Sequence, residues 1–76
     1  MIEGIDTDQR IGYMAGQEIA HINPYLHGDG LRYVGLHRLG EASQLLKLNA
    51  RLYLLGFRTG YRDELAGLAH PLPEYL

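Results

Sequence analysis

The placement of proline constrains this chain more than any other feature, because none occurs between Pro24 and Pro71. Proline lacks a backbone donor and clashes with the preceding turn, so helices end near it. Alanine, leucine, glutamine, lysine and arginine, which favour helix, dominate the second half of this proline-free stretch. We therefore expect the longest helix over about 41–66, followed by an extended, proline-containing tail over 68–76.

A first helix is expected over about 7–22. Asp6 can cap its N-terminus, with Gln9 as the reciprocal partner of a capping box, and the Asn23-Pro24 pair ends it. Apolar and small residues fall on one side of this helix at about 100° per residue, which indicates an amphipathic element. We expect that side to face the long helix.

Between these helices, Gly28-Asp29-Gly30 marks a turn, since glycine tolerates positive φ. The following residues favour a short helix over 31–39 that ends at Gly40. A strand over the same residues is the alternative, but one strand would have no partner in this chain. The predicted fold class is all-α: a small helical domain of two to three helices, with the long C-terminal helix packed against the first.

Two similar strings suggest how the helices pack. Ile11-Gly12-Tyr13-Met14-Ala15-Gly16 and Leu55-Gly56-Phe57-Arg58-Thr59-Gly60 share the order glycine, aromatic, any residue, small residue, glycine. Glycine inside a helix costs about 1 kcal/mol relative to alanine, and close approach of another backbone is a reason to accept that cost. We expect the helices to cross at short distance, within one chain or across a dimer. The predicted packing residues are Gly12, Gly16, Gly56 and Gly60.

Composition excludes several classes of protein. The chain has 76 residues, 46% of them hydrophobic, and no cysteine. That length allows one domain, 1–76, and the missing thiols exclude disulfide scaffolds, zinc ribbons and cysteine nucleophiles. No apolar run approaches the ~18 residues of a membrane span, and the first residues lack the pattern of a signal peptide. We expect a cytoplasmic protein that contacts no membrane.

No catalytic or metal-binding motif stands out. Asp63-Glu64 and the pair Asp6 and Asp8 are expected at helix ends, where capping or solvation explains them. We therefore expect no enzyme activity, no metal and no cofactor. The histidines match none of the usual ligand spacings; they are His21, His27, His37 and His70.

The outer face of the long helix is the feature that points to a function. On a helical wheel, four basic residues fall within about 60° of one another, with apolar and aromatic side chains beside them. Arginine and tyrosine around exposed leucine are typical of protein interfaces, although an ordinary solvated face is the alternative. The predicted partner-binding residues are Lys47, Arg51, Leu54, Arg58, Tyr61 and Arg62.

These features favour a small protein-binding module over an enzyme. We call Lys47, Arg51, Arg58 and Arg62 the basic stripe, and this stripe suits a partner protein with an acidic surface. Size and composition suggest a phage or mobile-element accessory protein that inhibits a host protein. A helix of about 25 residues would be ~38 Å long, more than this chain can cover, so we also expect a homodimer. The net charge of −2 and a pI near 6.0 make nucleic acid a less suitable partner.

A second interpretation rests on a resemblance. The chain contains, in this order, the strings Gly12-Tyr13-Met14-Ala15-Gly16, Pro24-Tyr25 and Tyr53-Leu54-Leu55-Gly56-Phe57-Arg58. This order is similar to that of the small ribosome modulation factors, which pair a Gly-Tyr-x-Ala-Gly helix with a Pro-Tyr loop and a Leu-Gly-Trp-Arg helix. The chain differs from them at Asn23, where the family has cysteine, and at Phe57, which replaces tryptophan. The resemblance implies the alternative function, a ribosome- or RNA-associated modulator.

Overall fold

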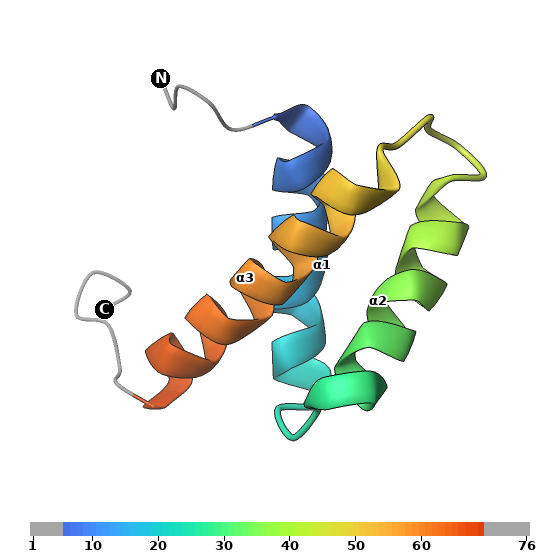
Figure 1. Ribbon diagram of the computed structural model, residues 1–76. Helices are drawn as coiled ribbons and strands as arrows, with labels where there is room; N and C mark the ends of the chain where they lie inside the picture. The colour runs from blue at the N-terminus through green and yellow to red at the C-terminus, as the bar shows by residue number, and fades with distance from the viewer. Residues whose placement is uncertain (1–5, 70–76) are drawn as a thin grey trace.

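The computed structural model describes residues 6–69, with side chains described as far as Gly67. This part of the chain forms three α-helices and no strand: α1 spans Thr7–Ile22, α2 spans Gly28–Ala42 and α3 spans Ala50–Ala69 (Figure 1). The all-α class, with the C-terminal helix packed against the first, is confirmed. None of these helices, over the residues described, is long and apolar enough to cross a membrane.

The first helix has the bounds predicted from the sequence, Thr7–Ile22. Asp6 is its N-cap, and the Asp6 carboxylate accepts a hydrogen bond from the backbone N–H of Asp8 at 2.8 Å. After the helix, the side-chain oxygen of Asn23 accepts from the backbone N–H of Tyr25 at 3.1 Å. This short turn leads the chain from α1 toward α2.

The other two helices differ from the prediction at their ends. The predicted start of the long helix near residue 41 is wrong, because α2 continues through Ala42 and residues 43–49 leave the helical path. Gly40 lies inside α2, which begins at Gly28 and not near residue 31. α3 continues through Ala69, so residues 68 and 69 are helical, and the rest of the predicted tail lies outside the described residues.

Asn49 explains where α3 begins. Its side-chain oxygen accepts a hydrogen bond from the backbone N–H of Leu52 at 3.0 Å, which is the arrangement of an N-cap. The backbone N–H of Asn49 donates in turn to the Asp8 carboxylate at 2.7 Å. Because Asp8 belongs to α1, a contact between residues far apart in sequence fixes the start of α3.

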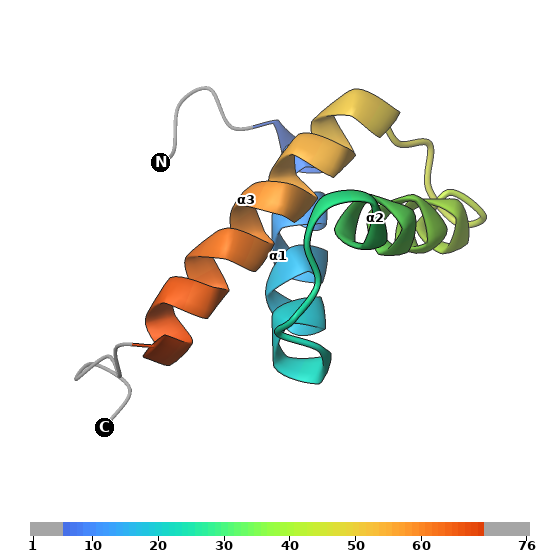
Figure 2. The same cartoon turned by 60° about the horizontal axis from the view of Figure 1, so that its bottom comes forward.

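α1 and α3 cross in close contact, as two views of the ribbon show (Figures 1 and 2). A Cβ on Gly12 would lie 2.0 Å from the carbonyl oxygen of Tyr53, and one on Gly56 would lie 2.0 Å from that of Gln9. A larger side chain at either position would therefore push the two backbones apart. The other two glycines of the paired strings have the same relation at 2.1 Å, Gly16 to the Phe57 oxygen and Gly60 to the Tyr13 oxygen.

The buried core centres on three aromatic residues of α3. Tyr53, Phe57 and Tyr61, each four residues from the next, have at most 2% of their surface exposed. α2 approaches this row through Gly35, where a Cβ would lie 2.9 Å from a ring carbon of Phe57. The remaining buried apolar residues come from α1 and α2; they are Ile19, Ala20 and Leu39.

Candidate functional site

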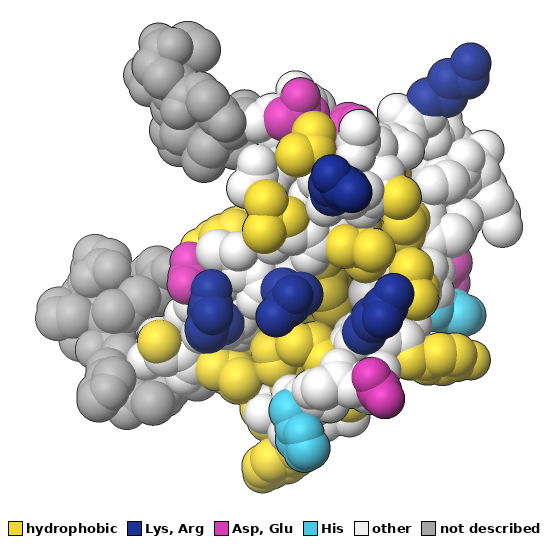
Figure 3. All heavy atoms as spheres, viewed as in Figure 1, with side chains coloured by type: hydrophobic (Ala, Val, Ile, Leu, Met, Phe, Trp, Pro, Cys, Tyr) yellow, Lys and Arg dark blue, Asp and Glu magenta, His cyan; other side chains and the backbone are white. Residues whose placement is uncertain are grey.

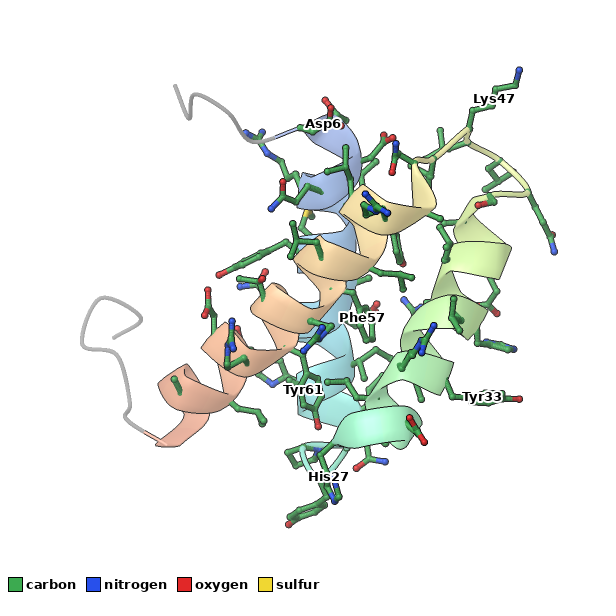
Figure 4. The ribbon with its side chains drawn as sticks, in the orientation of Figure 1. Asp6, His27, Tyr33, Lys47, Phe57 and Tyr61 are labelled. Carbon is green, nitrogen blue, oxygen red and sulfur yellow. The ribbon has the colours of Figure 1, made fainter. Side chains whose placement is uncertain are left out.

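The structure separates the basic residues of the predicted stripe. Arg51, Arg58 and Arg62 are exposed on α3, and their spacing of seven and four residues places them on one face of the helix. Lys47 lies apart from that face, in the connection before α3, and its side chain points away from the helix (Figure 4). The placement of Lys47 on the long helix is wrong, because α3 begins only at Ala50.

Tyr61 is buried, so its predicted place on the exposed face is also wrong. Its side chain is 2% exposed and points from α3 toward the turn that carries His27 (Figure 4). The Tyr61 hydroxyl donates to the carbonyl oxygen of Asn23 at 2.7 Å and accepts from the backbone N–H of Leu26 at 2.8 Å. The turn between α1 and α2 folds back over α3 here and buries Tyr61. A helical wheel of α3 alone does not include this turn, and it therefore predicts that Tyr61 is exposed.

A groove runs between α2 and α3 beside the exposed arginines. One hollow of about 390 Å³ lies against both helices, and a second of about 390 Å³ adjoins it farther along α3. Gly28, Leu31 and Arg58 line both hollows, which we together call the α2–α3 groove. Its other residues used below are His27, Arg32, Leu54, Phe57, Arg62 and Leu65.

Basic side chains flank an apolar floor in this groove. Leu31 and Leu54 are half-buried and Phe57 is fully buried beneath them. Arg32 comes from α2, whereas Arg58 comes from α3. Figure 3 shows hydrophobic surface beside the basic side chains over α3. The groove can therefore offer both apolar contact and paired hydrogen bonds to an anion.

The acidic side chains of α3, Asp63 and Glu64, contact residues of α1. The Asp63 carboxylate accepts from the Tyr13 hydroxyl at 2.7 Å, and the Glu64 carboxylate lies 2.6 Å from Nε2 of His21. Asp29, in the first turn of α2, is exposed and does not line the groove. Within residues 6–67, no ion pair involves Arg32, Arg51, Arg58 or Arg62, so these arginines are available to pair with an external anion.

A wider hollow between α1 and α2 has its charges already paired. It has a volume of about 590 Å³ and lies over Tyr53. Arg38 crosses it to contact Glu18 of α1, and it also contacts Glu41 of its own helix. Burial raises the pKa of the Tyr53 phenol above its usual 10.0, while the positive charge of Arg38 acts in the opposite direction. Because Arg38 already pairs with Glu18 and Glu41, this hollow has less free charge to bind a charged partner than the α2–α3 groove has.

The described histidines are dispersed. His21 contacts Glu64, His37 lies 4.0 Å from Glu41, and His27 lines one end of the α2–α3 groove. Across the side chains that the structure describes, no group of three or more histidine, aspartate or glutamate residues could hold a metal ion. His70 lies outside the described residues.

The α2 half of the groove was missed by the sequence analysis. Leu31 and Arg32 line the groove from α2, which packs closely against Phe57 at Gly35. A glycine in the middle of a predicted helix was a usable signal for that close packing. No local pattern, however, indicated that Arg32 would lie across a groove from Arg58.

No family model matches the chain, and no match was found among curated proteins or solved structures. The resemblance to the ribosome modulation factors therefore rests on the quoted strings alone. Within those strings, Gly12 and Gly16 of α1 and Gly56 of α3 are the positions where the helix backbones approach. The shared pattern thus coincides with the residues that pack α1 against α3.

Proposed function

We propose that this chain is a non-enzymatic protein-binding module that docks the acidic surface of another protein. The docking surface comprises the exposed face of α3 and the α2–α3 groove. The observation that carries the proposal is the set of arginines without an ion partner beside an apolar floor. Arginine is weakly hydrated and pairs with a carboxylate through two hydrogen bonds, so it suits a buried interface better than lysine does.

The proposal assigns binding, and not catalysis, to the groove. General acid–base chemistry needs a histidine or carboxylate that a neighbouring group orients. His27 lines the groove, but the lining as described includes no carboxylate that could orient its ring. The hydroxyl of Tyr61 is already committed to backbone groups of the turn between α1 and α2. Arginine, the main charged residue type of the lining, serves recognition.

Capture from cell lysate tests this proposal. The Arg51→Glu/Arg58→Glu variant should lose a protein that the unaltered chain retains, in both the presence and the absence of nuclease. The matched control is Arg10→Glu/Lys47→Glu, which makes the same change in charge at two exposed residues away from the groove. Equal capture by both variants would reject the proposal, provided that circular dichroism reports the same helix content.

The same arginines are the specific observation that favours the alternative function, an RNA-associated modulator. Phosphate contacts release counterions, so the affinity for RNA falls steeply as salt concentration rises. An interface that combines arginine with apolar contact depends less on salt. Capture that nuclease abolishes, together with a steep salt dependence, would replace the protein-binding proposal with this alternative.

Two finer parts of the sequence-based prediction remain predictions. Inhibition of a host protein by a phage or mobile-element accessory protein has no residue-level support in the groove.

The homodimer was predicted from a helix over about 41–66, whereas α3 spans Ala50–Ala69. Exposed apolar residues such as Tyr33 at 71% and Leu45 at 88% leave surface for a second copy. Light scattering at tens of micromolar protein would measure the mass directly.

A further inference from the structure

The shape of the α2–α3 groove limits what can occupy it. Along α3 its lining extends from Leu54 to Leu65, which is about 16 Å at a rise of 1.5 Å per residue. That length matches about three turns of a helix laid along the groove. Its apolar lining includes Leu31 from α2 and Leu54 from α3, so an occupant makes apolar contact with both helices.

The charges of the groove are arranged on both of its sides. Arg32 stands on α2, and Arg58 and Arg62 stand one turn apart on α3. An occupant that fits therefore carries carboxylates on both flanks of an apolar stripe. Carboxylates on one flank alone would leave the arginine of the opposite side unpaired in the interface.

We infer that the α2–α3 groove binds an amphipathic helix of the partner, with leucine-type side chains on the floor and Asp or Glu on both flanks. This inference rests on the proposed function and names the chemistry of the partner. Helix-in-groove binding uses apolar anchors at intervals of three and four residues, which suits a floor of this length. The arginines then fix the helix by pairing with its carboxylates.

A nucleic acid strand satisfies this surface less well. Phosphates can pair with Arg58 and Arg62, but a phosphate backbone leaves Leu54 and Leu31 without apolar contact. The stacking platforms of single-strand binding proteins are exposed aromatic rings, whereas Phe57 is fully buried in this groove. RNA binding is therefore an outcome of the test and not the inference.

The probe is a synthetic helical peptide of about four turns, or roughly 14 residues at 3.6 per turn. It carries leucine and one tryptophan on one face and glutamate on both flanks. Because the chain itself has no tryptophan, the emission of the peptide reports only the peptide environment. One control peptide has the same composition in a scrambled order, and a second has lysine in place of glutamate.

We expect a blue shift of the tryptophan emission on binding, with affinity at least about tenfold higher than for either control peptide. Arg32→Glu/Arg58→Glu should weaken binding by at least about tenfold. The control Arg10→Glu/Lys47→Glu should bind within about twofold of the unaltered chain, because both residues lie outside the groove. Amide NMR shifts should change most around Leu31 and Leu54.

Equal binding of the scrambled peptide, or shift changes centred away from the groove, would overturn the inference. A short RNA that shifts the groove amides while the acidic peptide does not would also overturn it. The inference can fail while the proposed function stands, if Arg51→Glu/Arg58→Glu abolishes lysate capture but Arg32→Glu/Arg58→Glu leaves peptide binding intact. If neither pair of substitutions has an effect, both proposals fail.

Discussion

Gly60 lies so close to Tyr13 that a Cβ on it would be 2.1 Å from the Tyr13 carbonyl oxygen. No rotation of a side chain can relieve that contact, because the Cβ is fixed to one backbone and the oxygen to the other. The same arrangement recurs at the other three glycines of the crossing. The close crossing of α1 and α3 therefore depends on the absence of these side chains.

Gly60→Ala should lower the free energy of unfolding by about 2–3 kcal/mol, since the helices must separate to admit the methyl group. Urea unfolding followed by circular dichroism measures this change. Gly40→Ala is the matched control, because Gly40 lies within α2 and a Cβ there would meet nothing within 4 Å. That variant should keep or slightly raise stability, by up to about 1 kcal/mol. Equal stability of both variants would contradict the account of the crossing.

Tyr61→Phe should lower the free energy of unfolding by about 1–2 kcal/mol, the usual cost of leaving hydrogen-bonding groups unpaired. The substitution removes the hydroxyl that bonds the Asn23 carbonyl and the Leu26 N–H, and leaves both backbone groups without this partner. Hydrogen exchange at the Leu26 amide should also become faster. Tyr33→Phe is the control, because Tyr33 is 71% exposed and should change stability by less than about 0.5 kcal/mol.

Stability should fall at alkaline pH in part through Tyr53. Burial raises the pKa of the folded Tyr53 phenol above 10.0, which is its value in an unfolded chain. The unfolded state thus loses its proton first, so this contribution is complete below pH 10 and is lost as the pH rises toward the folded pKa. Urea unfolding between about pH 8 and 11 should show a smaller decline for Tyr53→Phe. Identical declines in the two proteins would contradict this assignment.

The helix crossing could be predicted from the sequence because its signal is local. Gly12 and Gly16 have the spacing of Gly56 and Gly60, and aromatic residues follow in both strings. Such a pattern fixes a helix face without any knowledge of the partner helix. The bounds of α1 follow in the same way from Asp6, which caps it.

The features that the sequence did not predict correctly depend on contacts between different helices and turns. The start of α3 depends on Asn49, whose backbone is bonded to Asp8 of α1. The burial of Tyr61 depends on the turn that returns over α3 to meet it. Arg32 and the arginines of α3 line the same groove because of the way α2 packs against Phe57. These contacts join residues far apart in the sequence, so no periodic pattern or local spacing in the sequence predicts them.

Isothermal titration calorimetry of the captured partner with two doubly substituted chains measures whether the arginine face of α3 is the docking surface. Arg51→Glu/Arg58→Glu should weaken binding at least about thirtyfold, equivalent to ~2 kcal/mol, while its melting temperature stays near that of the unaltered chain. Arg10→Glu/Lys47→Glu should bind with nearly unchanged affinity. Equal affinities for the two folded variants would contradict the claim that the arginine face of α3 is the docking surface.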